Sequence, residues 1–317
     1  MIYLGIDTSN YTTSAAIYDP EKNSVEQLKK LLPVKKGDKG LRQSDAVFYH
    51  TQQLPDILQG LLLSDREKIC SVGVSSRPRA VAGSYMPCFT VGMCSAKSIS
   101  SALKCKYYEF SHQQGHIIAA LFSANRLDLI DGPFIAFHVS GGTTEALYVT
   151  PDSNEIIHCE KIISSSDLKA GQAIDRVGLM LELDFPCGRA LDALSLKSNK
   201  KFKIHPSVKD GNPSFSGLEN KCEKMLQDGA NKEDIALYCI EYVLASLEKM
   251  LEYLINKFGA VPIVFSGGVS SNTLINRYFS KKYSAIFAES KFSSDNAAGI
   301  AILAYLKEKQ SDTDFNS

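Results

Sequence analysis

Residues 2–19, IYLGIDTSNYTTSAAIYD, place two apolar runs on either side of a short polar segment. Apolar and β-branched runs bounded by turn residues are typical of strands, so this stretch predicts a hairpin with a polar tip. Residues 134–150, FIAFHVSGGTTEALYVT, repeat the plan with SGGTT as the turn. The repetition predicts a fold with an internal duplication.

Helical and strand patterns alternate along the rest of the chain. Short apolar runs predict strands in CSVGVS (70–75), VPIVFS (261–266) and SAIFAE (284–289). Apolar periodicity predicts helices over 44–63, 91–104, 170–183, 232–258, 270–283 and 295–309. These alternating elements indicate an α/β protein of two similar lobes facing one another.

Composition limits the classes of function. The 35 Lys and Arg residues balance 35 Asp and Glu residues, so the net charge of the chain does not attract nucleic acid or an anionic membrane. A local patch of basic residues is still compatible with this composition. Eight cysteines without a CxxC pair argue against a zinc ribbon or a disulfide framework, and indicate reduced thiols in a cytoplasmic protein. No apolar run reaches the roughly 18 residues of a membrane helix, and no export signal is expected.

The stretch HQQGH places His112 and His116 one helical turn apart on the same face. Two imidazoles in that arrangement can reach one metal ion. The alternative is that both histidines bond only to backbone or water at a helix start. A metal site would need a third ligand from elsewhere in the chain.

Ser-Gly-Gly occurs twice, at 140–142 and 266–268, each time after a buried strand. Glycines let the backbone approach a phosphate closely, and the following amides and hydroxyls can donate to its oxygens. Each turn taken alone is also an ordinary strand ending. Two such turns at two strand ends favour nucleotide binding.

Three further positions have a structural and a functional interpretation. Asp175, beside apolar neighbours on a predicted helix, is either a solvated face residue or an acceptor for a ribose hydroxyl. Gly188, in DFPCGRAL, either belongs to a plain helix-start turn or allows close approach of a nucleoside. Asp295, before the last predicted helix, is either an N-cap or a hard oxygen ligand.

The chain contains, in this order, the motifs GIDTS, FTVGMCSAK, HQQGH, VSGGTT, AGQAIDR, LDFPCGRAL, PSFSGL, FSGGVSSN and SSDNAAGIAI. This ordered set resembles the TsaD glycoprotease family of threonylcarbamoyl transferases, from residue 1 to about 309. The resemblance implies the actin/Hsp70/sugar-kinase fold, with two duplicated lobes around a nucleotide and metal cleft. We expect an N-terminal lobe over 1–110, with helix 296–311 packing back on it, and a C-terminal lobe over 111–295.

The resemblance also implies the site residues. The family's metal ligands fall on His112, His116 and Asp295, which would act in catalysis through one divalent ion, Fe²⁺ or Zn²⁺. The phosphate or acyl-phosphate would face the turn formed by Val139, Ser140, Gly141, Gly142 and Thr143. The nucleoside would be held by Asp175, Gly188 and Asn272.

In the family reaction, threonylcarbamoyl-adenylate is the donor and N6 of adenosine 37 in tRNAs reading ANN codons is the acceptor. AMP is the leaving group. The resemblance implies tRNA as substrate, together with a TsaB-like paralogue and a TsaE-like ATPase or a kinase-type partner. No membrane association is expected.

Several positions depart from the family pattern. Gln114 stands where the family has a carboxylate, Thr143 replaces a histidine, and Tyr11 and Thr12 replace two acids. The segment SSRPRAVAGS brings Arg77 and Arg79, and Glu219 replaces a lysine. Lost acids and added arginines predict a site more receptive to phosphate or carboxylate. Two alternatives follow: a divergent paralogue with another acceptor, or a catalytically silent nucleotide-binding partner.

Overall fold

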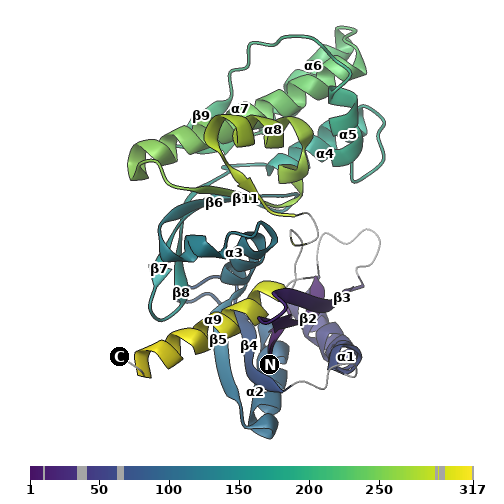
Figure 1. Cartoon of the computed structure of the whole chain (residues 1–317). Helices are drawn as coiled ribbons and strands as arrows, with labels where there is room; N and C mark the ends of the chain where they lie inside the picture. Colours follow the sequence, from purple (N-terminus) through teal and green to yellow (C-terminus); the bar gives the residue numbers. More distant parts are fainter. Residues whose placement is uncertain (10, 34–40, 63–67, 290–291, 293–296, 316–317) are drawn as a thin grey trace. The chain divides into compact units, whose positions relative to one another are not determined.

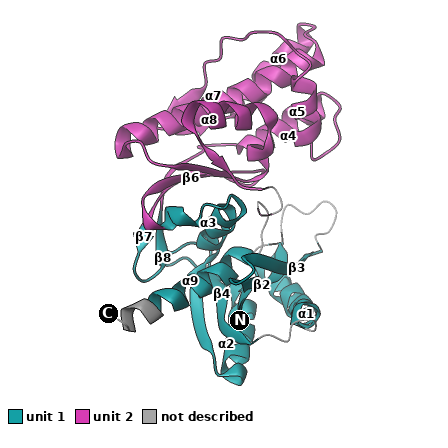
Figure 2. Cartoon of the chain, viewed as in Figure 1, with its two compact units in different colours: residues 1–130, 151–159, 294–317 teal, residues 131–150, 160–293 magenta. Residues whose placement is uncertain are grey.

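The computed structural model describes residues 1–9, 11–33, 41–62, 68–289, 292 and 297–315. By its internal contacts the chain divides into two compact units (Figure 2). Unit 1 contains residues 1–130, 151–159 and 294–317, and unit 2 contains residues 131–150 and 160–293. The lobe boundary expected near residue 110 stays a prediction, because it refers to lobes of the fold family and not to this division by contacts.

Unit 1 is built on a five-stranded mixed sheet, in the order β3-β2-β1-β4-β5. Its strands are β1 (Ile2–Asp7), β2 (Thr12–Asp19), β3 (Ser24–Leu31), β4 (Ile69–Arg77) and β5 (Lys106–Ser111). The pair β1–β2 is antiparallel, with Asp7 opposite Ser14, which confirms the hairpin predicted from residues 2–19. The pairs β1–β4 and β4–β5 are parallel, so the carboxyl ends of these three strands lie at one edge of the sheet.

The two faces of this sheet are covered by different helices, which are α1 (Gln43–Leu62), α2 (Phe89–Leu103), α3 (His112–Ser123) and α9 (Ala298–Phe315). Because side chains alternate along a strand, Leu4 and Val72 point into one core with residues of α1 and α2. Gly5 and Gly73, which pair across β1 and β4, face α9 instead. The glycines leave a groove into which the alanine-rich α9 packs, backbone against backbone (Figure 1).

Helix α9 also packs closely on α3. A Cβ atom added to Gly299 would lie 1.8 Å from the carbonyl oxygen of Gly115, which no real contact permits. Because both positions are glycine, the first turn of α9 lies directly against the helix that begins at His112. The segment η1 (Leu127–Asp131) then leads from α3 into the second sheet.

A second sheet, which lies in unit 2 apart from the parts of β7 and β8 within residues 151–159, repeats the sheet of unit 1 in the order β12-β11-β6-β7-β8. The strands are β6 (Phe134–Val139), β7 (Thr144–Asp152), β8 (Ile156–Ser164), β11 (Ile263–Ser266) and β12 (Ile286–Phe287). An antiparallel hairpin β6–β7 is again followed by parallel partners, β11 and β12. The matching strand orders confirm the internal duplication predicted from the two hairpin sequences.

The core of unit 2 is formed by the sheet and by α4 (Ala170–Met180), α5 (Gly188–Ser195), α6 (Ser216–Gln227), α7 (Lys232–Phe258) and α8 (Thr273–Tyr283). Within it, the rings of Phe137 and Phe265 stack at 4.5 Å on neighbouring strands. A small hairpin, β9 (Ser207–Lys209) with β10 (Asn212–Ser214), contacts α7. The 3-10 turn η2 (Gly268–Ser271) connects β11 to α8.

Most helix predictions are confirmed, with differences at the ends. Helix α4 stops at Met180 rather than 183, because Glu182 adopts a positive φ of 64° that a helix does not continue through. The helix predicted from 270 begins at Thr273, because Gly268–Ser271 form η2. Within the described ranges, the structure contains no helix with the length and apolar character needed to cross a membrane.

The contact between α9 and α3 yields a stability prediction. Gly299→Ala forces Cβ into a backbone carbonyl, which only a shift of the helices relieves, so we expect a loss near the upper end of about 1–3 kcal/mol in unfolding free energy. Urea unfolding measures it. Gly60→Ala is the matched control in unit 1, because its Cβ meets only the flexible end of Leu28 at 3.1 Å, and we expect a change within about 1 kcal/mol. Equal effects of the two substitutions would contradict the proposed packing.

Candidate functional site

The two predicted histidines lie at the start of α3 in unit 1, where β5 runs into the helix. Ser111 caps this helix, with its hydroxyl accepting from the amide of Gln114 at 3.2 Å. His112 and His116 are therefore on adjacent turns, and their Nε2 atoms lie 2.9 Å apart. The structure brings the two imidazole rings together, as the spacing predicted.

A buried carboxylate orients the first histidine. Asp7, 1% exposed at the end of β1, has Oδ2 2.7 Å from His112 Nδ1. The second oxygen of Asp7 accepts from the amide of Ser9 at 2.8 Å, and Ser9 Oγ also lies 2.9 Å from His112 Nδ1. A carboxylate at Nδ1 favours the tautomer with the proton on that nitrogen and leaves the lone pair on Nε2.

This geometry fits a metal ion. The two Nε2 atoms lie 2.9 Å apart, a hydrogen-bond distance, and two imidazole nitrogens this close together can also turn toward one ion. A carboxylate behind the coordinating imidazole is the usual outer partner of a metal-bound histidine. No cluster of three candidate ligands occurs within the part of the chain that the structure describes. Asp295, the predicted third ligand, lies outside the described residues.

The departure at Gln114 has a structural explanation. This side chain is fully buried, and its Oε1 accepts from Ser111 N at 2.7 Å and Ser111 Oγ at 2.8 Å. Its Nε2 donates to the carbonyls of Glu155 and Ile157, at 3.1 and 2.9 Å, and to Glu155 Oε2 at 3.0 Å. An amide satisfies both sets of partners, whereas a carboxylate would face three acceptors with no proton to donate.

The same network accounts for Arg77. Its guanidinium NH2 donates to both carboxylate oxygens of Glu155, at 2.6 and 2.8 Å. The expectation that Arg77 makes the site more receptive to an anion is therefore wrong, because Glu155 already neutralises it. The backbone amide of Arg79 donates to Ser84 Oγ at 3.0 Å. Glu219 is likewise paired, with Arg176 at 2.8 Å.

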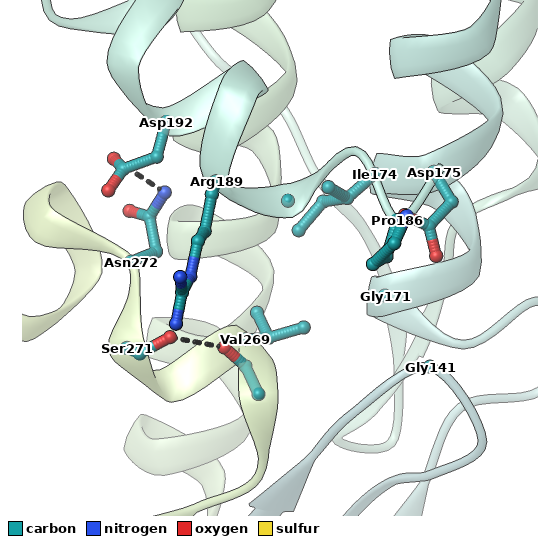
Figure 3. A pocket seen from close by; sticks show the side chains of 12 residues that line it. Gly141, Gly171, Ile174, Asp175, Pro186, Arg189, Asp192, Val269, Ser271 and Asn272 are labelled. Atoms are coloured by element: carbon teal, nitrogen blue, oxygen red, sulfur yellow. Dashed lines mark hydrogen bonds between the residues drawn. The ribbon is translucent and has the colours of Figure 1, made fainter. Parts of the chain in front are cut away.

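A cavity of about 470 Å³ lies in unit 2, at the carboxyl ends of β6 and β11 (Figure 3). These parallel strands end in the two Ser-Gly-Gly turns, which is where open α/β sheets bind ligands. Cavities of this size accommodate a nucleotide-sized ligand. The lining residues are Gly141, Gly171, Ile174, Asp175, Pro186, Gly188, Arg189, Asp192, Gly268, Val269, Ser271 and Asn272.

Glycines allow the backbone segments around this cavity to touch. A Cβ on Gly171 would lie 2.6 Å from the amide nitrogen of Gly141, so α4 begins directly against the first turn. Gly267, at a φ of 93°, places the second turn against the carbonyl of Val139. In the first turn, Ser140 Oγ accepts from the amides of Gly142 and Thr143 at 3.3 and 3.1 Å.

Two of the predicted nucleoside residues already have structural partners. Asn272 caps α8 by accepting from the amides of Leu274 and Ile275, both at 3.1 Å, and its Nδ2 donates to Asp192 at 2.9 Å. Asp175 Oδ1 accepts from the amide of Cys187 at 2.9 Å, which holds the turn preceding α5. Gly188 is the first residue of α5 and lines the cavity.

Sequence reasoning missed three residues of these sites: Asp7, Asp192 and Arg189. Asp7 lay within the quoted GIDTS motif, and its position at a strand end was the available signal. Asp192 accepts from Thr273 Oγ1 at 2.8 Å as well as from Asn272, so it ties α5 to α8. Arg189 extends along the cavity wall toward Ser271, on the side away from Asp175 (Figure 3). Among the described residues, no acid or acceptor pairs with its guanidinium.

Comparison with known proteins identifies similar sequences along the whole chain. A family model described as TsaD: tRNA N6-adenosine threonylcarbamoyltransferase matches residues 39–302. A protein of Brachyspira hyodysenteriae named tRNA N6-adenosine threonylcarbamoyltransferase is 30% identical, covering 100% of this chain and 94% of that protein. A protein of the same name from Kosmotoga olearia is 29% identical, covering 98% and 94%.

Solved structures with similar folds share little sequence. HypF of T. kodakarensis superposes with a TM-score of 0.58 at 12% identity, over 99% of this chain and 48% of that one. A ROK family glucokinase of Streptomyces griseus, in complex with glucose and AMPPNP, superposes at 0.51 and 12% identity, over 98% and 100%. The chain therefore has the actin/Hsp70/sugar-kinase fold that the motifs implied.

The buried amide at position 114 gives the prediction for this site. Gln114→Glu places a carboxylate against three acceptors, and we expect it to lower the free energy of unfolding at pH 7 by about 3–5 kcal/mol. Urea unfolding measures the loss. Gln52→Glu on the exposed face of α1 introduces the same charge, and we expect it to change stability by less than about 0.5 kcal/mol. A tolerated Gln114→Glu would refute the structural role of the amide.

Proposed function

This chain belongs to the TsaD family of tRNA N6-adenosine threonylcarbamoyltransferases, and we propose from the geometry of its sites how its own residues carry out the transfer. The enzyme is an acyltransferase that moves the threonylcarbamoyl group from threonylcarbamoyl-adenylate to N6 of adenosine 37 in tRNAs reading ANN codons. Neither alternative, a paralogue with another acceptor or a silent partner, is favoured by the comparisons. The observation that carries the mechanism is the convergence of Asp7, His112 and His116.

Members of this family are metal-dependent and bind nucleotide-like substrates. We propose that His112 and His116 bind one Fe²⁺ or Zn²⁺ ion through Nε2, and that Asp295 is a third ligand. The proximity of the two imidazoles and the Asp7 carboxylate behind His112 support this assignment. When bound, the ion supplies Lewis-acid polarisation and charge neutralisation at the transferred carbonyl or the phosphate.

Asp7 has a positioning role in this proposal. Its 2.7 Å contact with Nδ1 fixes the His112 ring and raises the basicity of Nε2. Gln114 contributes no proton transfer, because a neutral amide does not titrate and both of its ends are engaged in hydrogen bonds. Gln114, at the position where the family has a carboxylate, thus stabilises the start of the helix that contains His112 and His116.

We propose that the cavity of unit 2 binds the adenylate part of the donor and the AMP that leaves. Oδ2 of Asp175, the oxygen that does not accept from Cys187, would accept from a ribose hydroxyl. The phosphate would lie at the turn of Val139 to Thr143, where it replaces Ser140 Oγ as the acceptor of the two amides. Because those contacts are long, at 3.3 and 3.1 Å, exchanging them costs little.

Arg189 has a distinct role in this arrangement. Asp175 and Gly141 lie on the same side of the cavity, so a ribose and phosphate placed there direct the base toward Arg189 (Figure 3). We propose that the planar guanidinium lies against the adenine ring. Gly188 permits the close approach, while Asn272 and Asp192 hold the wall formed by α5 and α8.

We propose that a TsaB-like paralogue and a TsaE-like ATPase, or a kinase-type partner, work with this enzyme in the cytoplasm. The membership in the family supports these partners. The test of the function is a single-turnover assay with threonylcarbamoyl-adenylate and unmodified tRNA, with both partners from the same source. Modified tRNA and released AMP in equal amounts are expected. Release of AMP without modified tRNA would refute the assigned acceptor.

The metal site gives a prediction with a readout independent of activity. Asp7→Asn keeps the size of the side chain and removes its charge, and we expect a 10- to 100-fold weaker affinity for Zn²⁺ in a chelator competition. His112→Ala and His116→Ala are expected to lose stoichiometric binding. Asp192→Asn in unit 2 is the control and should leave metal affinity unchanged. If Asp7→Asn bound Zn²⁺ as tightly as the wild type, the positioning role would be wrong.

The cavity gives a prediction that separates contact with the base from contact with the phosphate. We expect Arg189→Ala to weaken adenosine and AMP equally, by roughly 10-fold, because the lost contact is to the ring. Calorimetric titration measures both affinities. Arg189→Lys keeps the positive charge but lacks the planar guanidinium group, so it should restore little of the lost affinity. A loss confined to AMP would instead place the guanidinium at the phosphate and refute the proposed orientation.

A further inference from the structure

The segment that follows α5 is strongly basic although the chain as a whole is neutral. Five lysines and one histidine occur between 197 and 209, and no acid does. We name residues 197–209 the basic ribbon. It starts two residues after α5, the short helix whose first turn lines the cavity of unit 2. Along the chain it is therefore about one helix length, roughly 12 Å, from that cavity.

Exposure alternates residue by residue along the second half of the ribbon. The exposed positions are Lys201, Lys203, His205, Ser207 and Lys209. The intervening positions, Phe202, Ile204, Pro206 and Val208, are partly buried. Such a period of two is typical of an extended chain, in which side chains on one face repeat about every 6.6 Å. All the basic side chains of this half therefore share one outward face.

The inward face is anchored on α7 and on the neighbouring strand. Phe202 packs edge-on against Tyr238 at 5.3 Å. The amide of Ser207 donates to Tyr242 Oη at 3.0 Å, and Ser207 pairs with Ser214 across β9 and β10. The outward side chains are thus held on a fixed support and not on a free loop.

The lysines of the outward face have no ion pair among the residues that the structure describes. Lys200, at the start, differs: it lies 3.2 Å from Asp234 and is thereby partly neutralised. Lys201 and Lys203 are one two-residue repeat apart, and Lys209 lies three repeats further along the same face. Exposed cations on one face can contact successive phosphates of a nucleic-acid strand and release counterions when it binds.

The apolar residues of the ribbon argue against a membrane as the partner. Membrane-surface segments present apolar side chains beside the basic ones, so that both enter the interface. Here Phe202, Ile204 and Val208 turn toward the protein. The outward face offers only ammonium groups, an imidazole and a hydroxyl, which are the groups that contact phosphate oxygens.

We propose that the basic ribbon binds the phosphate backbone of the tRNA substrate. This inference rests on the proposed function, which requires a tRNA to be held while one of its bases reacts. The ribbon supplies affinity and position without reading sequence, because contacts to phosphates carry no base information. It is a substrate-binding element and takes no part in the chemical step.

The experiment compares two triple variants of the full chain with the same change in charge. Lys201→Gln, Lys203→Gln and Lys209→Gln neutralise the ribbon. Lys30→Gln, Lys68→Gln and Lys104→Gln neutralise three exposed lysines of unit 1. The affinity for unmodified tRNA is measured by fluorescence anisotropy between 50 and 300 mM salt, and the affinity for adenosine is measured in parallel.

We expect the ribbon variant to bind tRNA roughly 10- to 100-fold more weakly at 100 mM salt. The slope of log affinity against log salt should decrease in magnitude by about 2–3, since each lost phosphate contact removes about 0.7–0.9. Adenosine affinity and the single-turnover rate at saturating tRNA should stay at wild-type values. The unit 1 variant should keep the wild-type slope within about 0.5.

An unchanged slope in the ribbon variant, or an equal loss in the unit 1 variant, would overturn the proposal. A loss of binding to vesicles containing anionic lipid, with tRNA affinity kept, would assign the ribbon to a membrane and also overturn it. If the wild type binds tRNA through the basic ribbon but does not modify the bound tRNA, the proposed function is wrong and the binding role of the ribbon is confirmed. If the wild type modifies tRNA and the ribbon variant has wild-type affinity, only the ribbon fails.

Discussion

Close backbone packing at glycine is the constraint on which unit 1 depends. Gly5 and Gly73 pair on adjacent strands and form the groove that receives α9, and Gly115 lets α3 lie against the first turn of the same helix. A Cβ at Gly5 or Gly73 would meet backbone atoms of α9, which cannot move independently, and a Cβ at Gly115 would meet the side chain of Ile300. The sheet, the helix bearing the two histidines and the C-terminal helix are therefore fixed together. Asp7, at the end of the strand that contains Gly5, is delivered to His112 by this arrangement.

Position 114 shows how a departure from a family motif can leave a site intact. The amide joins the capping box of α3 to the carbonyls of Glu155 and Ile157, and the Glu155 carboxylate in turn pairs with Arg77. The two departures at 77 and 114 thus meet in one network with Glu155. Their combined effect is electrostatic balance around the start of α3, and neither adds a free charge to the site.

Although the net charge of the chain is zero, unit 2 contains a basic segment beside its ligand cavity in the sequence. Unit 2 places the glycine-lined cavity at the carboxyl ends of two parallel strands, and the basic ribbon after α5 contains Lys201, Lys203 and Lys209, which have no ion pair among the described residues. Composition excluded a global field, but it averages over the chain and says nothing about which side chains share a face. Alternating exposure along the ribbon depends on its packing against Tyr238 and Tyr242, which no local pattern specified.

The sequence by itself determined the α/β class, the duplicated hairpins, most helices and the pairing of His112 with His116, because these follow from periodicity and local spacing. The sequence also indicated the family, because the family's motifs occur in it in a fixed order. Only the tertiary structure decided the partners of these residues: Asp7 behind His112, Glu155 on Arg77, Asp192 on Asn272 and Arg189 in the cavity. Asp7 and His112 are 105 positions apart, and contacts across such separations arise from strand order and helix packing. Local pattern fixes what an element is, whereas the packing of elements fixes which side chains meet.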